Sequence, residues 1–337
     1  MRLFIHHSNG IKFIINGMIM VAIVLSMAIG ISYGATDIDL ATVWEATLHF
    51  NPDLAEHQVI QELRLPRVLA AALVGACLAV SGTIMQGMTR NPLASPSIMG
   101  VTDGAAFGLM VMMALFPSVS GIGVMVSSFI GAGLAVTAIF MISSSSGGVM
   151  SSVKLALAGV AIGTMLRAVT TILALHFQLE KEMGFWLAGG LDQVTWGSVK
   201  ILCVLTVIGI LLAISISKSM TVLSLGEDVS VGLGQNNLFV KILGIITVFA
   251  LTGAAVSIAG AIGFVGLIVP HITRFVIGSD FRWIIPSSAI FGALLLVLSD
   301  VVARMVNAPY ETPVGAITSL IGVPFFLYLA RSKGGEA

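Results

Sequence analysis

The main pattern along the chain is a series of long apolar runs separated by short polar connections. A membrane-spanning helix needs about 20 apolar residues at a rise of 1.5 Å each. Runs that approach this length predict spans at 16–34, 65–88, 100–116, 121–142, 155–177, 198–217, 239–259, 264–277, 284–304 and 313–330. The third and eighth are short and Gly-rich or broken by proline, as in helices that are buried in protein or line a cavity. The pattern predicts an all-α, polytopic integral membrane protein with about ten transmembrane helices.

The composition supports this interpretation. Hydrophobic residues make up 57% of the 337 residues and charged residues only 9%, whereas a soluble domain carries about 25% charge. A surface so poor in charge requires lipid as its solvent, and the zero net charge gives no indication of nucleic acid binding. Cys77 and Cys203 lie in apolar runs and are interpreted as small core residues rather than as a disulfide or a metal pair.

The cations of the connections indicate which side each connection faces, since cytoplasmic connections carry an excess of Lys and Arg. If ten spans alternate from a cytoplasmic N-terminus, ten of the 16 cations fall inside, five fall outside and Arg167 lies within the fifth span. Six acidic residues share the first outer connection: Asp37, Asp39, Glu45, Asp53, Glu56 and Glu62. We therefore expect both termini in the cytoplasm. Eight or nine spans stay open if the eighth run is re-entrant.

Two arginines enter an apolar helix from the outer side, at Arg64 and Arg67. Their spacing of three residues places them on one face of a helical turn. Snorkelling to the interface could explain them, but interfacial arginines are commoner on the inner side. We favour a docking surface for an acidic partner.

A second polar interruption, at 223–234, lies in the longest predicted cytoplasmic connection. Leu225, Val229 and Leu233 repeat every four residues, and glycines at 226, 232 and 234 divide the segment into short helices. A soluble motor subunit could grip a short amphipathic helix of this kind. A connector that lies on the surface fits equally well, so periodicity alone leaves both interpretations open.

The remaining polar groups do not form an enzyme site. The sequence has no Gly-rich phosphate loop followed by Lys and Ser or Thr, no HExxH and no GxSxG. Asp103, Asp300 and His271 are scattered, and His271 follows Pro270 in a Gly-rich run, where a proton relay or a structural role is open. We expect no enzymatic activity, no cofactor and no metal site, so work against a gradient would need an ion or a partner.

Nine motifs, in this order, resemble the FecCD/BtuC-type permease family of ABC importers for ferric siderophores, haem and cobalamin. They cover about four-fifths of the chain: RLPR at 64–67, SGTIMQGMTRNPLASPSIMG at 81–100, LALAGVAIG at 155–163, WLAGGL at 186–191, LSLGEDVSVGLG at 223–234, GAIGFVGLIVPHITR at 260–274, GSDFR at 278–282, SDVVAR at 299–304 and ETPVGAITSLIGVPFF at 311–326. One departure is Gly189-Gly190 followed by Asp192, where Gly-Ser is more usual. We expect it to change only a local contact.

The resemblance implies a role for specific residues. Outward-facing arginines that pair with glutamates of a binding protein would be Arg64, Arg67 and Arg304. The coupling element seated on the ATPase would be led by Leu225, Gly226, Glu227 and Asp228, and the cytoplasmic gate would be Ser151, Ser152 and Val153.

The resemblance also implies the assembly. Residues 1–337 would form one permease domain in a bacterial cytoplasmic membrane. Its partners would be two ATP-binding subunits, an extracytoplasmic substrate-binding protein and a second permease subunit, identical or paralogous. The cargo would be a metal chelate, with ferric siderophore the first expectation. An ion-coupled secondary transporter using Asp103, Asp300 or His271 is the alternative, and an intramembrane enzyme would need polar residues that converge.

Overall fold

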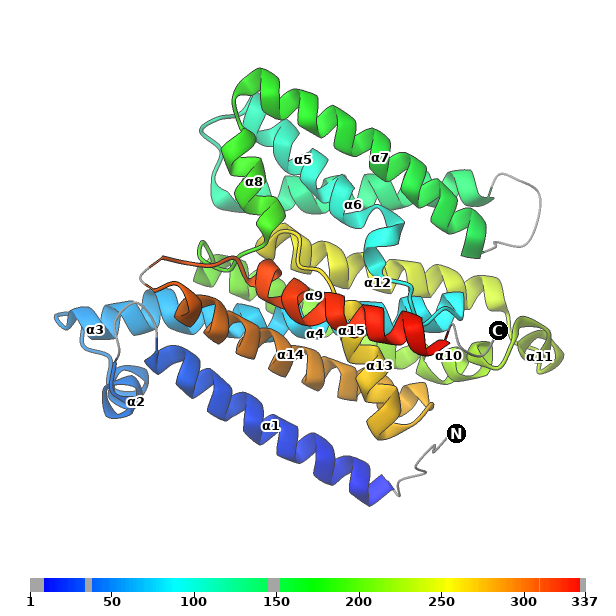
Figure 1. Cartoon of the computed structure of the whole chain (residues 1–337), viewed down its shortest axis with the longest axis horizontal. Helices are drawn as coiled ribbons and strands as arrows, with labels where there is room; N and C mark the ends of the chain where they lie inside the picture. Colours follow the sequence, from blue (N-terminus) through cyan, green and yellow to red (C-terminus); the bar gives the residue numbers. More distant parts are fainter. Residues whose placement is uncertain (1–8, 34–37, 145–151, 309, 334–337) are drawn as a thin grey trace.

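The computed structural model describes residues 9–33, 38–144, 152–308 and 310–333, and these form helices joined by turns and loops (Figure 1). The long and apolar helices are α1 (Asn9–Ser32), α4 (Leu65–Thr89), α5 (Val101–Leu115), α6 (Gly121–Ser144), α7 (Ser152–Phe177), α9 (Trp196–Ser215), α12 (Asn237–Ala259), α13 (Val265–Ile277), α14 (Phe281–Val306) and α15 (Val314–Lys333). Shorter elements are α2 (Leu40–Leu48), α3 (Ala55–Gln58), the π-helical η1 (Val59–Arg64), the 3-10 helix η2 (Pro96–Met99), α8 (Glu180–Ala188), α10 (Ser217–Ser224) and α11 (Glu227–Gly232).

These helices coincide with the apolar runs of the sequence. Seven helical segments in the described ranges are long and apolar enough to cross a membrane, one of them continuous from α3 through η1 to α4. Shorter apolar helices occupy the third, eighth and tenth predicted spans as α5, α13 and α15. The all-α, polytopic membrane class is confirmed, while the count of ten crossings and the cytoplasmic side of the termini stay predictions.

Helix α4 forms the centre of the molecule. It packs against α9, α12, α13 and α14, and most of its side chains are buried. Gly82 meets the backbone of α13 so closely that an added Cβ would overlap the Gly266 carbonyl group. Apolar burial does not attract helices to one another within lipid, so close contact through small residues supplies much of the packing energy. The glycines of the sequence therefore set the spacing of this core.

The interruptions expected around the third and eighth spans are present. Helix α4 ends at Thr89, Arg90 takes a left-handed conformation at φ 50°, and a turn leads through η2 to α5. Residues 260–264 are not helical, and α13 starts only at Val265 and continues through Pro270. On α13, the His271 ring lies edge-on to Phe325 of α15, with 5.7 Å between centroids.

The two ends of the molecule differ. In Figure 1, α2 and α3 lie at the left end, whereas α11, the first turn of α1 and the last turns of α15 lie at the right end. Helices α5, α6 and α7 pack on one another, and α5 and α6 also contact α12. Helix α7 is the outermost of this group, which leaves much of its surface uncovered.

Candidate functional sites

The first candidate site is a charged cluster at the α2–α3 end, which we call the outer arginine cluster: Arg64, Arg67, Arg304, Asp300 and Glu311. Asp300 of α14 is 1% exposed and binds two arginines: Arg67 Nε lies 2.9 Å from Oδ1, and Arg304 Nη2 lies 3.0 Å from Oδ2. Arg67 Nη1 also lies 2.6 Å from Oε1 of Glu311, whose side chain is half-exposed. The cluster thus joins α4, α14 and the segment before α15.

The same cluster caps the end of α1. Arg64 Nη1 donates hydrogen bonds to the Ile31 carbonyl at 2.6 Å and the Ser32 carbonyl at 2.8 Å. Arg304 Nη1 donates to the Gly30 carbonyl at 2.7 Å. The last carbonyl groups of a helix lack partners within it, and the negative end of the helix dipole attracts cations. Two guanidinium groups therefore fix the end of α1 against α4 and α14.

The structure brings together all three arginines that were predicted to dock a partner, but it does not leave them free at the surface. Each of Arg64, Arg67 and Arg304 is only 7% exposed. Their acceptors were missed in the sequence, although Asp300 stands four residues before Arg304, the spacing of a helical ion pair. Docking therefore stays a prediction, whereas the contacts with Asp300 and with the end of α1 give the arginines an internal structural role.

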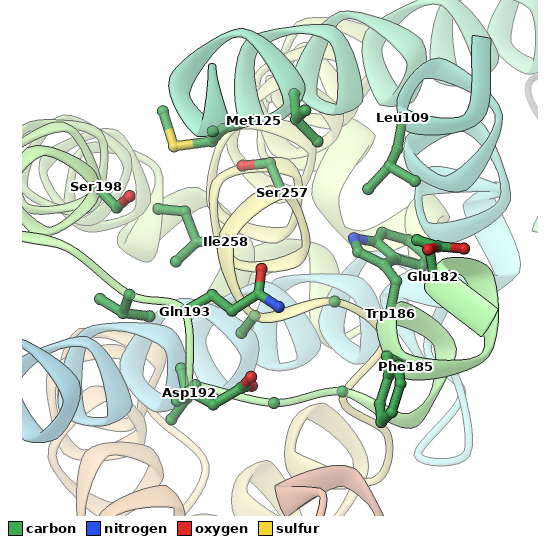
Figure 2. Close-up of a pocket in the computed structure, with 18 of the residues that line it drawn as sticks. Leu109, Met125, Glu182, Phe185, Trp186, Asp192, Gln193, Ser198, Ser257 and Ile258 are labelled. Carbon is green, nitrogen blue, oxygen red and sulfur yellow. The ribbon is translucent and has the colours of Figure 1, made fainter. Parts of the chain in front are cut away.

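A cavity of about 780 Å³ adjoins the cluster, with Arg67 and Glu311 in its wall. Figure 2 shows Asp192 and Gln193 of the connection after α8 on one side of it and Phe185 and Trp186 of α8 on the other. The Trp186 Nε1 atom is buried and has no hydrogen-bond acceptor in the described part of the chain. The cavity therefore combines an aromatic wall with polar groups.

The Gly-Gly departure from the family pattern lies in this wall. The Gly190 amide donates to the Ala259 carbonyl at 3.0 Å, and the Gly315 amide donates to the Gly189 carbonyl at 3.2 Å. These bonds tie the connection to the end of α12 and to the start of α15. The Gly-Gly sequence therefore lies where backbone hydrogen bonds join three segments that line the cavity.

The second candidate site is the segment 223–234 at the opposite end. The expected division of this segment into short helices is present, because Gly226, at φ 134°, separates α10 from α11. The apolar row is exposed: Leu225 is 66%, Val229 49% and Leu233 68% accessible. An exposed apolar row on a short helix is typical of a surface that a partner covers.

Polar contacts with α12 hold this segment in place on the side opposite the exposed apolar row. Glu227 Oε1 lies 2.9 Å from Nζ of Lys241 on α12, and Lys241 is 4% exposed. Asn237 Nδ2 donates to Ser230 Oγ at 2.7 Å and to the Glu227 carbonyl at 3.3 Å. Of the predicted coupling residues, Glu227 thus holds the segment on α12, whereas Leu225 and Asp228 are exposed.

Helix α10 is held on the start of α14 by Asp280. Thr221 Oγ1 donates to Asp280 Oδ1 at 3.3 Å and accepts from the Phe281 amide at 3.0 Å. Asp280 also accepts hydrogen bonds from the side chain and amide of Arg282. The side-chain hydrogen bonds from Arg282 hold the pKa of Asp280 below its usual range.

The other predicted groups are placed as follows. Ser151 lies outside the described residues, and so do the side chains of Ser152 and Val153, although α7 begins at Ser152. Cys77 is buried as expected, but Cys203 is exposed on α9, which corrects its interpretation as a core residue. No group of three or more His, Cys, Asp or Glu that could hold a metal occurs among the described residues.

The three groups considered for ion coupling are each engaged. Asp103 pairs with Arg167 at 2.9 Å, Asp300 belongs to the outer arginine cluster, and the His271 ring lies edge-on to Phe325. Both carboxylates are thus committed to contacts with arginine, and the imidazole ring to a contact with an aromatic ring. The geometry therefore gives no support to a proton-coupled mechanism.

The fold and its two candidate sites define a helical membrane transport protein. Residues 18–332 match the FecCD transport family, and the chain belongs to this family. It is 55% identical to the iron(3+)-hydroxamate import system permease protein FhuB of Bacillus subtilis, over 92% of this chain and 80% of that protein. It is 45% identical to the iron-uptake system permease protein FeuB of the same organism, over 94% of each.

A solved structure agrees with these relatives. An inward-facing metal-chelate type ABC transporter is 29% identical to this chain, with a TM-score of 0.83 over 94% of this chain and 99% of that one. The predicted family is thereby confirmed. The chain is a membrane permease subunit of the ABC-importer kind, a class in which ATP hydrolysis belongs to a separate subunit, and not an enzyme.

Proposed function

We propose that this chain carries a ferric siderophore of the hydroxamate class across a bacterial cytoplasmic membrane. The observation that carries this proposal is the 55% identity, over most of both chains, to a permease named for iron(3+)-hydroxamate import. The whole chain, residues 1–337, serves as one permease domain with ten spans and cytoplasmic termini. It works with two ATP-binding subunits, an extracytoplasmic binding protein and a second permease subunit, identical or paralogous.

The outer arginine cluster is the proposed docking site for the binding protein. It holds three cations, Arg64, Arg67 and Arg304, against two carboxylates, and so it has an excess of positive charge. Glu311 is half-exposed, and a carboxylate of the partner can take its place on Arg67 without disturbing Asp300. Such charge pairing sets the rate and the register of docking more than the affinity.

A charge-balanced variant tests this docking. Arg67→Gln with Glu311→Gln removes one cation and one anion and leaves the Asp300–Arg304 pair intact. In the reconstituted complex, the concentration of loaded binding protein that half-stimulates ATPase activity should rise about tenfold, the effect of roughly 1.4 kcal/mol. Glu311→Gln alone should not raise it. Lys200→Gln, which removes an exposed cation of α9, is the matched control. Unchanged half-stimulation in the double variant contradicts the docking assignment.

The exposed apolar row of 223–234 is the proposed contact with the ATPase subunit. Leu225, Val229 and Leu233 would enter a groove of that subunit, with Gly226 and Asp228 beside them, while the Glu227–Lys241 pair transmits its movement to α12. The gate at Ser151, Ser152 and Val153 would open as the paired permeases rock between outward and inward states.

Co-purification tests this contact. Leu225→Ser with Leu233→Ser should reduce the amount of ATPase subunit retained by the tagged permease. Leu238→Ser, which changes a leucine of similar exposure outside the row, should not. Equal retention by both variants contradicts the coupling assignment.

A further inference from the structure

A second cavity lies between the start of α1 and the start of α14, and its volume is about 790 Å³. Lys12, Phe13 and Asn16 of α1 form one wall, and Arg282 and Trp283 of α14 form the other. In Figure 1 the first turn of α1 lies at the same end of the molecule as α11. The cavity is therefore separate from the outer arginine cluster and from the cavity that adjoins it.

Lys12 brings a buried cation to this cavity without an anionic partner. It is 7% exposed, and its Nζ forms no ion pair or hydrogen bond within the described residues. The ring of Trp283 lies beneath it, with 5.6 Å from Nζ to the centroid. An ammonium group carries three donors, and a ring face offers electrostatic attraction alone. Since a buried charge without partners is costly, a molecule in the cavity must complete these hydrogen bonds.

Arg282 supplies a second cation. Its side chain is 58% exposed, and its Nη2 lies 2.7 Å from Oδ2 of Asp280. Nε also serves this carboxylate, whereas Nη1 makes no hydrogen bond within the described residues. Asp280 in turn accepts from Thr221 and from the Arg282 amide, so its oxygen atoms are occupied. Two cations and one carboxylate line the cavity, and the net charge is positive.

The wall becomes apolar further along α14. Pro286 and Ile290 follow Arg282 at intervals of four residues, so they lie on the same face of the helix, about 6 and 12 Å further along it. On the α1 side, the Phe13 ring lies edge-on to Trp283 with 4.8 Å between centroids. A cationic end that continues into an apolar wall suits an amphiphile with an anionic head.

The position of the cavity indicates where such a molecule comes from. Helix α1 is outermost on the side opposite α7 (Figure 1), and its Met18 and Val21 side chains are exposed. Lys12 lies about 5 Å from the start of α1, and Arg282 is the second residue of α14. Both cations are therefore near the ends of their spans, at the level of lipid headgroups, where tryptophan rings such as Trp283 are also enriched.

We propose that this cavity binds an anionic phospholipid. Lys12 Nζ and Arg282 Nη1 donate hydrogen bonds to the phosphate group, and an acyl chain lies along Pro286 and Ile290. Basic pockets between membrane helices bind anionic headgroups in this way. Inorganic phosphate or an acidic side chain of a partner would meet the same cations, but neither makes use of the apolar wall. The bound lipid bridges α1 and α14, and this site does not depend on the identity of the cargo.

Lipid binding to the purified permease tests the site. The full chain is stripped of lipid in detergent and titrated with dioleoyl phosphatidylglycerol, and the first bound lipid is measured by native mass spectrometry. This lipid should bind at least about tenfold more tightly than dioleoyl phosphatidylcholine, whose headgroup has no net charge. Equal binding of the two lipids overturns the proposal.

Substitutions locate the binding. Lys12→Gln should weaken binding of phosphatidylglycerol about tenfold, as for the loss of one charged hydrogen bond. It leaves the Arg282–Asp280 pair intact. Lys218→Gln, which removes an exposed cation of α10, is the matched control and should bind as the wild type does. Equal binding by the wild type and Lys12→Gln overturns the assignment of the lipid to this cavity.

Competition separates a lipid from the other anions. Inorganic phosphate and glycerol 3-phosphate lack acyl chains, so neither should displace phosphatidylglycerol at equal molar concentration. Phosphatidylglycerol should also stay bound when the ATPase subunits are added to the permease. Displacement by either phosphate compound assigns the cavity to a free anion, and release on addition of the ATPase subunits assigns Lys12 and Arg282 to a protein contact. Each of these results overturns the lipid assignment.

Discussion

Replacing Asp300 probes the outer arginine cluster most severely. Asp300→Asn preserves the size of the side chain but removes the charge that Arg67 and Arg304 share. Arg67 keeps Glu311, whereas Arg304 is left with backbone carbonyl groups alone. The variant therefore leaves a buried cation without a counterion, in contact with the end of α1.

The size of the effect follows from this burial. Asp300 is 1% exposed, so solvent does not screen its ion pairs. Removing one partner of a buried ion pair costs about 3–5 kcal/mol. At about 2 °C per kcal/mol for a chain of this size, the apparent melting temperature should fall by roughly 6–10 °C.

Thermal aggregation of the detergent-purified permease, followed by size-exclusion chromatography, measures this fall. Glu62→Gln is the matched control, because Glu62 is an exposed carboxylate just before α4. Adding Arg304→Gln to Asp300→Asn removes the orphaned cation and should restore part of the loss. A melting temperature for Asp300→Asn within about 2 °C of the wild type refutes the argument that Asp300 organises the cluster. Such a small fall would correspond to a loss of stability below the roughly 3 kcal/mol expected at the least.

Three further outcomes are expected. Glu227→Gln removes the counterion of the buried Lys241, so amide hydrogen exchange in 227–233 should quicken about tenfold, and unchanged exchange argues against this attachment. Gly82→Ala forces a Cβ into α13 and should destabilise the permease by about 1–3 kcal/mol in thermal melts, whereas Gly17→Ala, with open space around it, should not. Asp280 has a lowered folded pKa, so it stabilises the fold above its unfolded pKa of about 3.9 and ceases to do so as the pH falls through the folded value. Asp280→Asn should therefore lower the melting temperature at pH 7, and the difference from the wild type should shrink below about pH 4; a difference independent of pH contradicts this role.

Much of the fold follows from the apolar runs alone. The long helices fall on the predicted spans because lipid demands a helix wherever the backbone crosses it. The ends were less predictable: α1 begins at Asn9 rather than near residue 16, since polar Asn9 and Lys12 are helical although they lie outside the apolar run. Cys203 was misplaced because an apolar helix shows in its sequence no difference between a core face and a lipid face.

The candidate sites were predicted only in part. The exposed row of 225, 229 and 233 was visible as a period of four residues, because apolar residues on one face of a surface helix recur every three or four positions. Glu311, by contrast, is 244 positions from Arg67, and only the packing of the chain brings them together.

The source of energy is the central claim of this account, and one transport measurement tests it directly. The chain is reconstituted in vesicles with its ATPase subunits and its loaded binding protein, and accumulation of radioactive iron as a ferric hydroxamate is followed. We expect accumulation that requires ATP and continues at the same rate when a protonophore or a sodium ionophore collapses the ion gradients. Accumulation by the permease alone, abolished by either ionophore and indifferent to ATP, would contradict the account.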